Sequence, residues 1–171
     1  QDYLRVLETL GAEDPRIHGI LVGAEIESQR SFVESFRASV ARSPMRDRLH
    51  LVGFQADVPA WLASFEVLIF PSHSEACPIV VLEAMEAGVP MVLTRVGEVP
   101  QMIGDLAVPV VAVEDVAALV AGTRKMLALT PAERLALADQ VRERARAGYS
   151  LAAVAGRHAA LYRQLAENFP V

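Results

Sequence analysis

Residues 67–94, VLIFPSHSEACPIVVLEAMEAGVPMVLT, are predicted to form a strand, a helix and a second strand. The first six and the last five of these residues are almost continuously apolar, which indicates burial on both faces of a parallel sheet. The helix should cover about 78–87, because Pro78 suits its first position and Gly88 suits the position after its last residue. This unit predicts an α/β protein.

The alternation of strands and helices continues on both sides of this unit. Further apolar strands are expected at 17–23, 49–54 and 106–111, and helices at 2–10, 25–41, 57–65, 114–128, 131–147 and 150–167. This order is typical of a doubly wound, Rossmann-like parallel sheet. After residue 111 only helices follow, so we expect a single domain over 1–171 with a helical C-terminal tail.

The composition is that of a packed globular domain. The chain has 171 residues, 53% of them hydrophobic, and a net charge of −5. This balance excludes a disordered protein and argues against a general nucleic-acid binder, which usually has a basic surface. The single cysteine, Cys77, excludes an intrachain disulfide and a zinc site built on cysteines. No apolar run approaches the ~18 residues of a membrane span, and we expect a cytoplasmic protein.

The carboxyl ends of the predicted strands are the first places to look for a binding site, because ligands of such sheets bind there. The residues at these ends are Gly23 after the first strand, Gly53 and Phe54 after the second, the loop 71–78 after the third, and the loop 94–100 after the fourth. Gly23 would let a ligand approach the backbone closely, although a tight turn explains it equally well.

The helix that begins at Pro78 is predicted to attract an anion. With Cys77 as the cap residue, the N–H groups of Ile79 and Val80 have no partner inside the helix. These groups and the helix dipole favour a negative ligand, of which phosphate is the commonest. The sequence therefore predicts a phosphate site at Cys77, Pro78, Ile79 and Val80.

Two glutamates flank this helix start, eight positions apart. Glu83 lies about one and a half turns into the helix, where a carboxylate can accept hydrogen bonds from a ribose diol. Glu75 precedes the helix and would face a transferred group. An exposed Glu83 and a Glu75 that merely favours the dipole are the simpler alternatives, but the apolar neighbours of Glu83 indicate a partner. We interpret His73, two residues before Glu75, as a solvated loop histidine.

The ordered motifs around these glutamates resemble a known family. The E-x7-E pattern of Glu75 and Glu83, preceded by FPSHS and continued by AMEAGVPMVLTRVGEVPQMI, is similar to that of the GT-B fold glycosyltransferases of family 4. LHLVGF at 49–54 and the segment 57–72 also resemble that family. The resemblance covers nearly the whole chain and is strongest over 49–104. An isolated E-x7-E is a weak signal, whereas the ordered set is a strong one.

The resemblance implies the donor-binding, C-terminal half of a retaining glycosyltransferase that uses a nucleotide-sugar, with UDP, GDP or ADP as the nucleotide, and no metal or other cofactor. Glu75 would act in the transfer, and Glu83 would hold the ribose. The amides around Cys77–Val80 would receive the diphosphate, and Gly53 and Phe54 would lie by the base. The chemistry would be stabilisation of a diphosphate leaving group.

Several features depart from the family pattern. The loop after Glu75 reads Ala76-Cys77-Pro78 where the family commonly has glycines, and Glu98 replaces the second glycine of V-G-G. The family's Arg and Lys that neutralise the diphosphate follow a first strand, and this chain begins after that point. We therefore expect the chain to lack that strand and its own N-terminal acceptor domain, and to be inactive alone.

The resemblance also bears on what the complete protein contacts. The helix 150–167 resembles one that reaches back to the acceptor domain, which would leave an apolar face uncovered here. Many members of the family work at the inner face of the bacterial membrane. The resemblance therefore also allows peripheral membrane association of the full protein. Two alternatives to a transferase half are kept: a non-catalytic nucleotide-binding or interaction module, and another GT-B enzyme such as a sugar-nucleotide epimerase.

Overall fold

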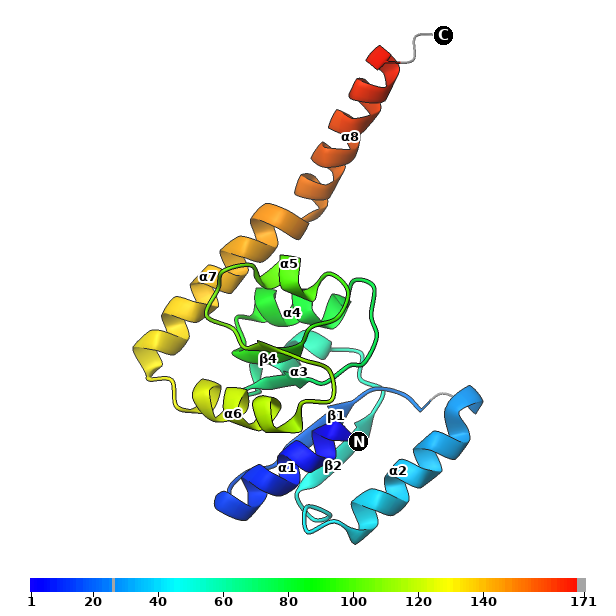
Figure 1. Ribbon diagram of the computed structural model, residues 1–171, viewed down its shortest axis with the longest axis vertical. Helices are drawn as coiled ribbons and strands as arrows, with labels where there is room; N and C mark the ends of the chain where they lie inside the picture. The colour runs from blue at the N-terminus through cyan, green and yellow to red at the C-terminus, as the bar shows by residue number, and fades with distance from the viewer. Residues whose placement is uncertain (26, 169–171) are drawn as a thin grey trace.

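The computed structural model describes residues 1–25 and 27–168, with strands and helices that alternate along the chain (Figure 1). The helices are α1 (Asp2–Glu13), α2 (Arg30–Arg42), α3 (Val58–Ala63), α4 (Ile79–Ala87), α5 (Val99–Ile103), α6 (Val116–Leu127), α7 (Pro131–Tyr149) and α8 (Leu151–Asn168), with the 3₁₀ helix η1 (Glu27–Gln29) before α2. The strands are β1 (Gly19–Val22), β2 (Leu49–Gly53), β3 (Leu68–Phe70), β4 (Met91–Thr94) and β5 (Val110–Val111). The predicted α/β class and helical C-terminal part are confirmed.

The strands form two parallel sheets. β1 pairs with β2, and β3, β4 and β5 pair in that order. Parallel pairing was predicted correctly, but the expected single sheet is divided, since no ladder joins β1 to β3 within the described residues. The division has a physical cause: the facing edges of β1 and β3 stand apart, and backbone groups pair only when strands lie about 4.8 Å from each other.

A groove of about 1040 Å³ separates the two sheets, and we call it the inter-sheet groove. Its walls include Ile20 and Val22 of β1 on one side and Leu68 and Ile69 of β3 on the other, and helices α1 and α3 contribute further apolar side chains. The groove is therefore a largely apolar slot between the two sheets.

The hydroxyl of Tyr3 on α1 satisfies the edge of β1 inside this groove. It donates a hydrogen bond to the carbonyl oxygen of Ile20 at 3.2 Å and accepts one from the Ile20 N–H at 3.1 Å. Burial raises the pKa of Tyr3 to about 12, so the hydroxyl keeps the proton that it donates. The side chain thus pairs both backbone groups of Ile20, which a buried edge requires.

Two hydrophobic cores hold the elements together. The larger core surrounds β4, whose four residues are all buried. The smaller core consists of Leu4, Leu7, Val40, Met45 and Leu49. Helix α1 belongs to both, because Leu4 and Leu7 face the smaller core while Val6 and Leu10 face the larger one. Spacings of three and four residues place each pair on one side of the helix.

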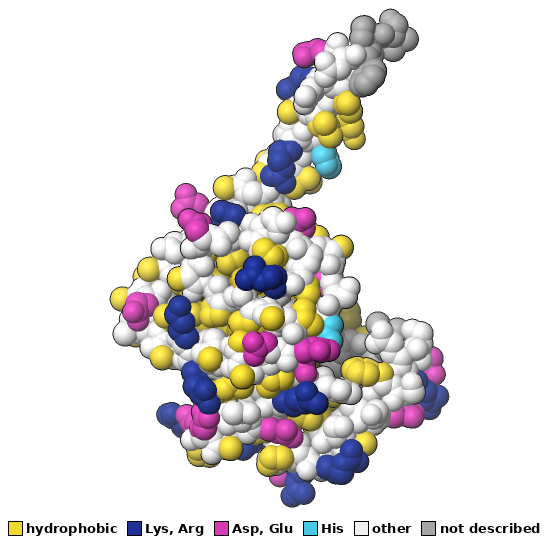
Figure 2. All heavy atoms as spheres, in the orientation of Figure 1, with side chains coloured by type: hydrophobic (Ala, Val, Ile, Leu, Met, Phe, Trp, Pro, Cys, Tyr) yellow, Lys and Arg dark blue, Asp and Glu magenta, His cyan; other side chains and the backbone are white. Residues whose placement is uncertain are grey.

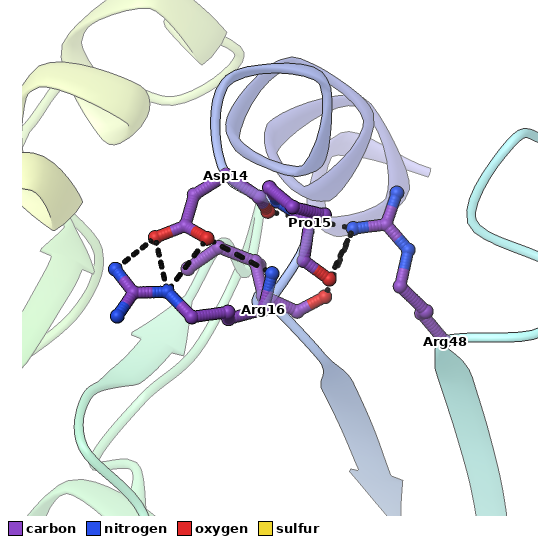
Figure 3. A network of polar contacts seen from close by, with 5 residues as sticks. Asp14, Pro15, Arg16 and Arg48 are labelled. Atoms are coloured by element: carbon purple, nitrogen blue, oxygen red, sulfur yellow. Dashed lines mark hydrogen bonds and ion pairs between the residues drawn. The ribbon is translucent and has the colours of Figure 1, made fainter.

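Two arginines fix the loop that leads from α1 into β1 (Figure 3). The Arg48 guanidinium donates hydrogen bonds of 3.1–3.4 Å to the carbonyl oxygens of Gly11, Asp14, Pro15 and Ile17. Arg16 donates to both carboxylate oxygens of Asp14 and holds the pKa of that carboxyl at about 2. These contacts set where β1 begins and hence how its edge faces the inter-sheet groove.

Helix α8 extends away from the body of the molecule (Figure 1). None of its described residues is buried, and its apolar side chains are visible along the extension in Figure 2. The large exposed ones are Leu151, Leu161, Tyr162 and Leu165. The expected uncovered apolar face is therefore present. Within residues 1–25 and 27–168, no helix combines the length and the apolar character that crossing a membrane requires.

Candidate functional site

The loop between β3 and α4 carries Glu75 and is tied to the end of β4. The Thr94 hydroxyl lies 2.6 Å from the carbonyl oxygen of Ser72 and 3.2 Å from that of Phe70. The Ser72 hydroxyl in turn donates to Oε1 of Glu75 at 2.9 Å. Thr94 is fully buried and Glu75 is exposed. A buried anchor therefore presents the Glu75 carboxylate at the carboxyl edge of the sheet.

A second loop, between β4 and α5, packs on the backbone of the Glu75 loop at Gly97. A Cβ atom on Gly97 would lie 2.1 Å from the carbonyl oxygen of Ala76 and 2.5 Å from that of Glu75. The N–H of Glu98 donates to the same Ala76 oxygen at 2.9 Å. Only glycine permits this approach, so Gly97 shapes the site. The sequence interpretation had selected the loop 94–100 without identifying this contact.

The variant Gly97→Ala is expected to lose more stability than Gly53→Ala. Both glycines have positive φ, +48° and +69°, so each alanine costs about 1–2 kcal/mol in backbone strain. At Gly53 a Cβ meets nothing within 4 Å, whereas at Gly97 it overlaps backbone atoms and adds about 1–3 kcal/mol. Urea unfolding of the two variants measures the difference, and equal losses would contradict the close contact.

The start of α4 lies one residue later than predicted. Pro78 is the N-cap, with φ −71° and ψ 111°, and the helix begins at Ile79. The extended ψ keeps Pro78 outside the helix, while its fixed φ still suits the entry. The N–H of Val81 turns back to the Pro78 carbonyl oxygen at 3.1 Å. The N–H groups of Ile79 and Val80 are left without an intrahelical partner, as the anion-site hypothesis requires.

Glu83 lies on the side of α4 that faces the inter-sheet groove. Its side chain lines the groove and is half-buried. Among the described residues no hydrogen bond or ion pair to its carboxylate is found, whereas Glu86 one turn later pairs with Arg146. A half-buried carboxylate without a protein partner is an acceptor available to a ligand.

The carboxyl ends of β1 and β2 meet at two glycines. The Gly23 N–H donates to the Gly53 carbonyl oxygen at 2.9 Å, and the two residues have φ of +150° and +69°. An added Cβ at either position would meet nothing within 4 Å, so the space above both is open. Phe54 follows with 75% of its surface exposed. At this corner of the molecule, the backbone of Gly23 and Gly53 and the ring of Phe54 are therefore accessible to a ligand.

The structure gathers part of the predicted site around one cavity. Four of the predicted residues line the inter-sheet groove: Gly23, Phe54, Val80 and Glu83. Gly53 adjoins Gly23 just outside that lining. The others lie on the loop before α4 and at its start: Glu75 and Cys77 are exposed, Pro78 is buried, and the Ile79 side chain is 69% exposed.

Sequence reasoning missed the contacts that hold the Glu75 loop in place. His73 was interpreted as a solvated loop histidine, and its side chain is 53% exposed, but its Nε2 also lies 2.7 Å from Oδ2 of Asp2. These residues are 71 positions apart, and no spacing rule links them. Thr94 was expected at a strand end near the site, but its contacts with Phe70 and Ser72 were not foreseen. Within the described residues, no group of three or more His, Cys, Asp and Glu side chains is placed to hold a metal ion.

Comparison with known sequences identifies relatives over part of the chain. The lipopolysaccharide core biosynthesis mannosyltransferase LpsB of Rhizobium meliloti (strain 1021) is 29% identical over 84 residues, which are 49% of this chain and 24% of that protein. The N-acetyl-alpha-D-glucosaminyl L-malate synthase of Bacillus anthracis is 39% identical over 59 residues, which are 34% of this chain and 16% of that protein. The matches span a quarter or less of each relative.

Comparison of folds and of family models extends over most of the chain. The crystal structure of Anabaena Alr3699/HepE in complex with UDP matches with a TM-score of 0.83 at 19% identity, covering 94% of this chain and 44% of that one. At this identity the likeness shows the shared GT-B fold. The model of the family described as Glycosyl transferases group 1 matches residues 2–129. The chain therefore belongs to the glycosyl transferases group 1 family.

Proposed function

We propose that this chain is the donor-binding part of a retaining glycosyltransferase that takes its sugar from a nucleotide-diphospho-sugar. The observation that carries the proposal is the half-buried Glu83 carboxylate, which lines the inter-sheet groove without a partner among the described residues. It lies about one turn from the free N–H groups at the start of α4. N–H donors that can bind an anion, next to a carboxylate that can accept hydrogen bonds from a diol, fit the phosphate and the ribose of a nucleotide.

The roles of the residues follow from this arrangement. The N–H groups of Ile79 and Val80 would receive the diphosphate, and Glu83 would accept hydrogen bonds from the ribose hydroxyls. The exposed ring of Phe54, next to the open backbone of Gly23 and Gly53, would adjoin the base. Glu75 would face the sugar that is transferred.

The chemistry of such a site is stabilisation of the leaving group. As the bond between the sugar and the diphosphate breaks, negative charge builds on the diphosphate oxygens. The amides at the helix start are already oriented toward that charge, so they need not reorganise during the reaction. The known relatives support this reading: LpsB is described as a mannosyltransferase, and the Anabaena structure is a complex with UDP.

The complete enzyme would contain parts that this chain does not. We propose a further strand in the apolar part of the inter-sheet groove between β1 and β3, beside the end at Glu83 and Phe54 that the donor would use, and an N-terminal acceptor domain that closes over the donor. The separation of β1 from β3 and the partial coverage of the relatives support these two parts. The acceptor domain and the apolar face of α8 would then be neighbours. We place the complete enzyme in the cytoplasm.

Binding of nucleotides tests the proposed function. Isothermal titration calorimetry with UDP, GDP and ADP is expected to show that one of the three binds selectively. Selective binding would support a donor site and identify the base. If none of the three nucleotides binds to this chain or to the complete protein, the proposal is contradicted. A non-catalytic interaction module would then be favoured.

This chain alone is expected not to turn over a nucleotide-sugar. The diphosphate would lack the positive charges that neutralise it in the family. The acceptor domain, which would exclude water from the reaction, would be absent as well. Incubation with UDP-, GDP- and ADP-sugars, followed by detection of released nucleotide, measures both transfer and hydrolysis. Release at roughly 1 s⁻¹ or faster, as in ordinary enzymes, would show that the missing parts are not needed.

A further inference from the structure

Three segments that are distant in the sequence meet at the carboxyl edge of the larger sheet. They are the start of α1 with Asp2, the β3–α4 loop with His73, and the turn before α6 with Glu114. Nε2 of His73 lies 2.7 Å from Oδ2 of Asp2, and Nδ1 lies 3.7 Å from Oε1 of Glu114. One imidazole ring therefore stands between two carboxylates.

The contact with Asp2 is the closer of the two, at 2.7 Å against 3.7 Å, and Asp2 is buried whereas Glu114 is exposed. Its side chain is only 8% exposed, so little water can solvate its carboxylate. Its other charged neighbour, Arg5, lies at 3.6 Å from Oδ1 and is itself 65% exposed. A carboxylate with so little water depends on a close hydrogen-bond donor. The His73 ring is that donor.

The second contact of the ring is the weaker one. The 3.7 Å between Nδ1 and Oε1 of Glu114 is longer than a hydrogen bond, and the Glu114 side chain is 75% exposed. The contact with Asp2 occupies Nε2, so His73 has a structural partner although it lies only two residues before Glu75.

The loop that His73 belongs to is held at three points. Thr94 of β4 holds the Ser72 carbonyl oxygen at 2.6 Å, and the Glu98 N–H holds the Ala76 carbonyl oxygen at 2.9 Å. Between these two points, Asp2 of α1 holds the His73 side chain, and without that contact the segment 73–75 could move and carry Glu75 with it. We propose that His73 is a positioning residue: through Asp2 it fixes the loop 73–76, and thereby Glu75 and the free amides of α4.

This inference rests on the proposed function for its effect on donor binding, but its structural part can be tested alone. The variants are His73→Ala and Asp2→Ala, which remove the contact, and His73→Gln, whose amide can still donate to Asp2. Asp47→Asn serves as a control, because among the described residues that carboxylate pairs with Arg46 alone and the pair is exposed. Hydrogen exchange of the Glu98 amide, which donates to the Ala76 carbonyl oxygen, is the first measurement.

We expect exchange of the Glu98 amide to be roughly tenfold faster in His73→Ala and Asp2→Ala, with little change in exchange within β4. In His73→Gln and Asp47→Asn it should stay close to that of the unchanged chain. A general loss of stability would speed exchange throughout and would not be rescued by glutamine. Equal exchange of this amide in all four variants would overturn the proposal.

The affinity for the nucleotide that binds the unchanged chain is the second measurement. It should fall roughly tenfold in His73→Ala and recover in His73→Gln, since the amides of α4 follow the loop. Unchanged affinity together with faster exchange would limit His73 to the loop and overturn its link to the donor site. If no nucleotide binds to any variant, the proposed function fails, and the exchange data still decide whether the contact positions the loop.

Discussion

Replacement of Glu83 by alanine is expected to lower nucleoside diphosphate affinity by about 30- to 100-fold, or roughly 2–3 kcal/mol. The carboxylate lines the inter-sheet groove half-buried, and no protein group among the described residues uses it. Charge-assisted hydrogen bonds to two ribose hydroxyls are the interactions that alanine would remove. Calorimetric titration of the two proteins measures the ratio of dissociation constants.

Two variants make this result specific. Glu86→Ala removes a carboxylate from the same helix, but one that is exposed and paired with Arg146, so nucleotide affinity should not change. Glu83→Gln keeps the size of the side chain and weakens the acceptor, and it should lie between alanine and glutamate. Equal affinities of Glu83→Ala and the unchanged chain would show that Glu83 does not bind the ribose.

The variant Ile79→Pro is expected to lower diphosphate affinity by about tenfold or more without unfolding α4. Proline is tolerated at the first helical position, and it removes one N–H from the proposed anion seat. The residue before a proline must be extended, and Pro78 already is, with ψ of 111°. The lost isoleucine side chain is 69% exposed, so little packing is lost with it.

The matched control for this prediction is Ile79→Ala, which removes the same side chain and keeps the N–H. Titrating each variant with the nucleoside and with its diphosphate separates the effects. The proline should weaken the diphosphate and leave the nucleoside unchanged, whereas the alanine should affect neither. A proline variant that binds the diphosphate normally would show that the start of α4 is not the phosphate seat.

The sequence was sufficient to predict the local elements because their signals are local. The apolar runs around β3 and β4 and the glycine at 88 placed the strand–helix–strand unit, and Gly88 ends α4 in the left-handed conformation. The fifth strand was predicted over 106–111 but covers only Val110–Val111. Pro109 contributes only its carbonyl oxygen, which accepts from the Leu93 N–H at 3.0 Å, and because it has no N–H to donate the regular strand begins after it.

The parts that sequence could not predict depend on contacts between distant segments. The division of the sheet is decided by which strand edges lie within hydrogen-bonding distance, and apolar runs do not encode that. The partnership of His73 with Asp2 joins the first turn of the chain to a loop near its middle. The roles of Glu75, Glu83 and the amides of α4 stay predictions, whereas their placement around one edge follows from the order of strands.

The sharing of α1 between the two cores has a consequence for how the protein comes apart. Leu4 and Leu7 belong to one core and Val6 and Leu10 to the other, so a single helix transmits stability between them. While α1 stays folded, the two halves melt together as one cooperative unit. Once α1 unfolds, each half is stabilised only by its own contacts, and we expect unfolding to proceed in two stages.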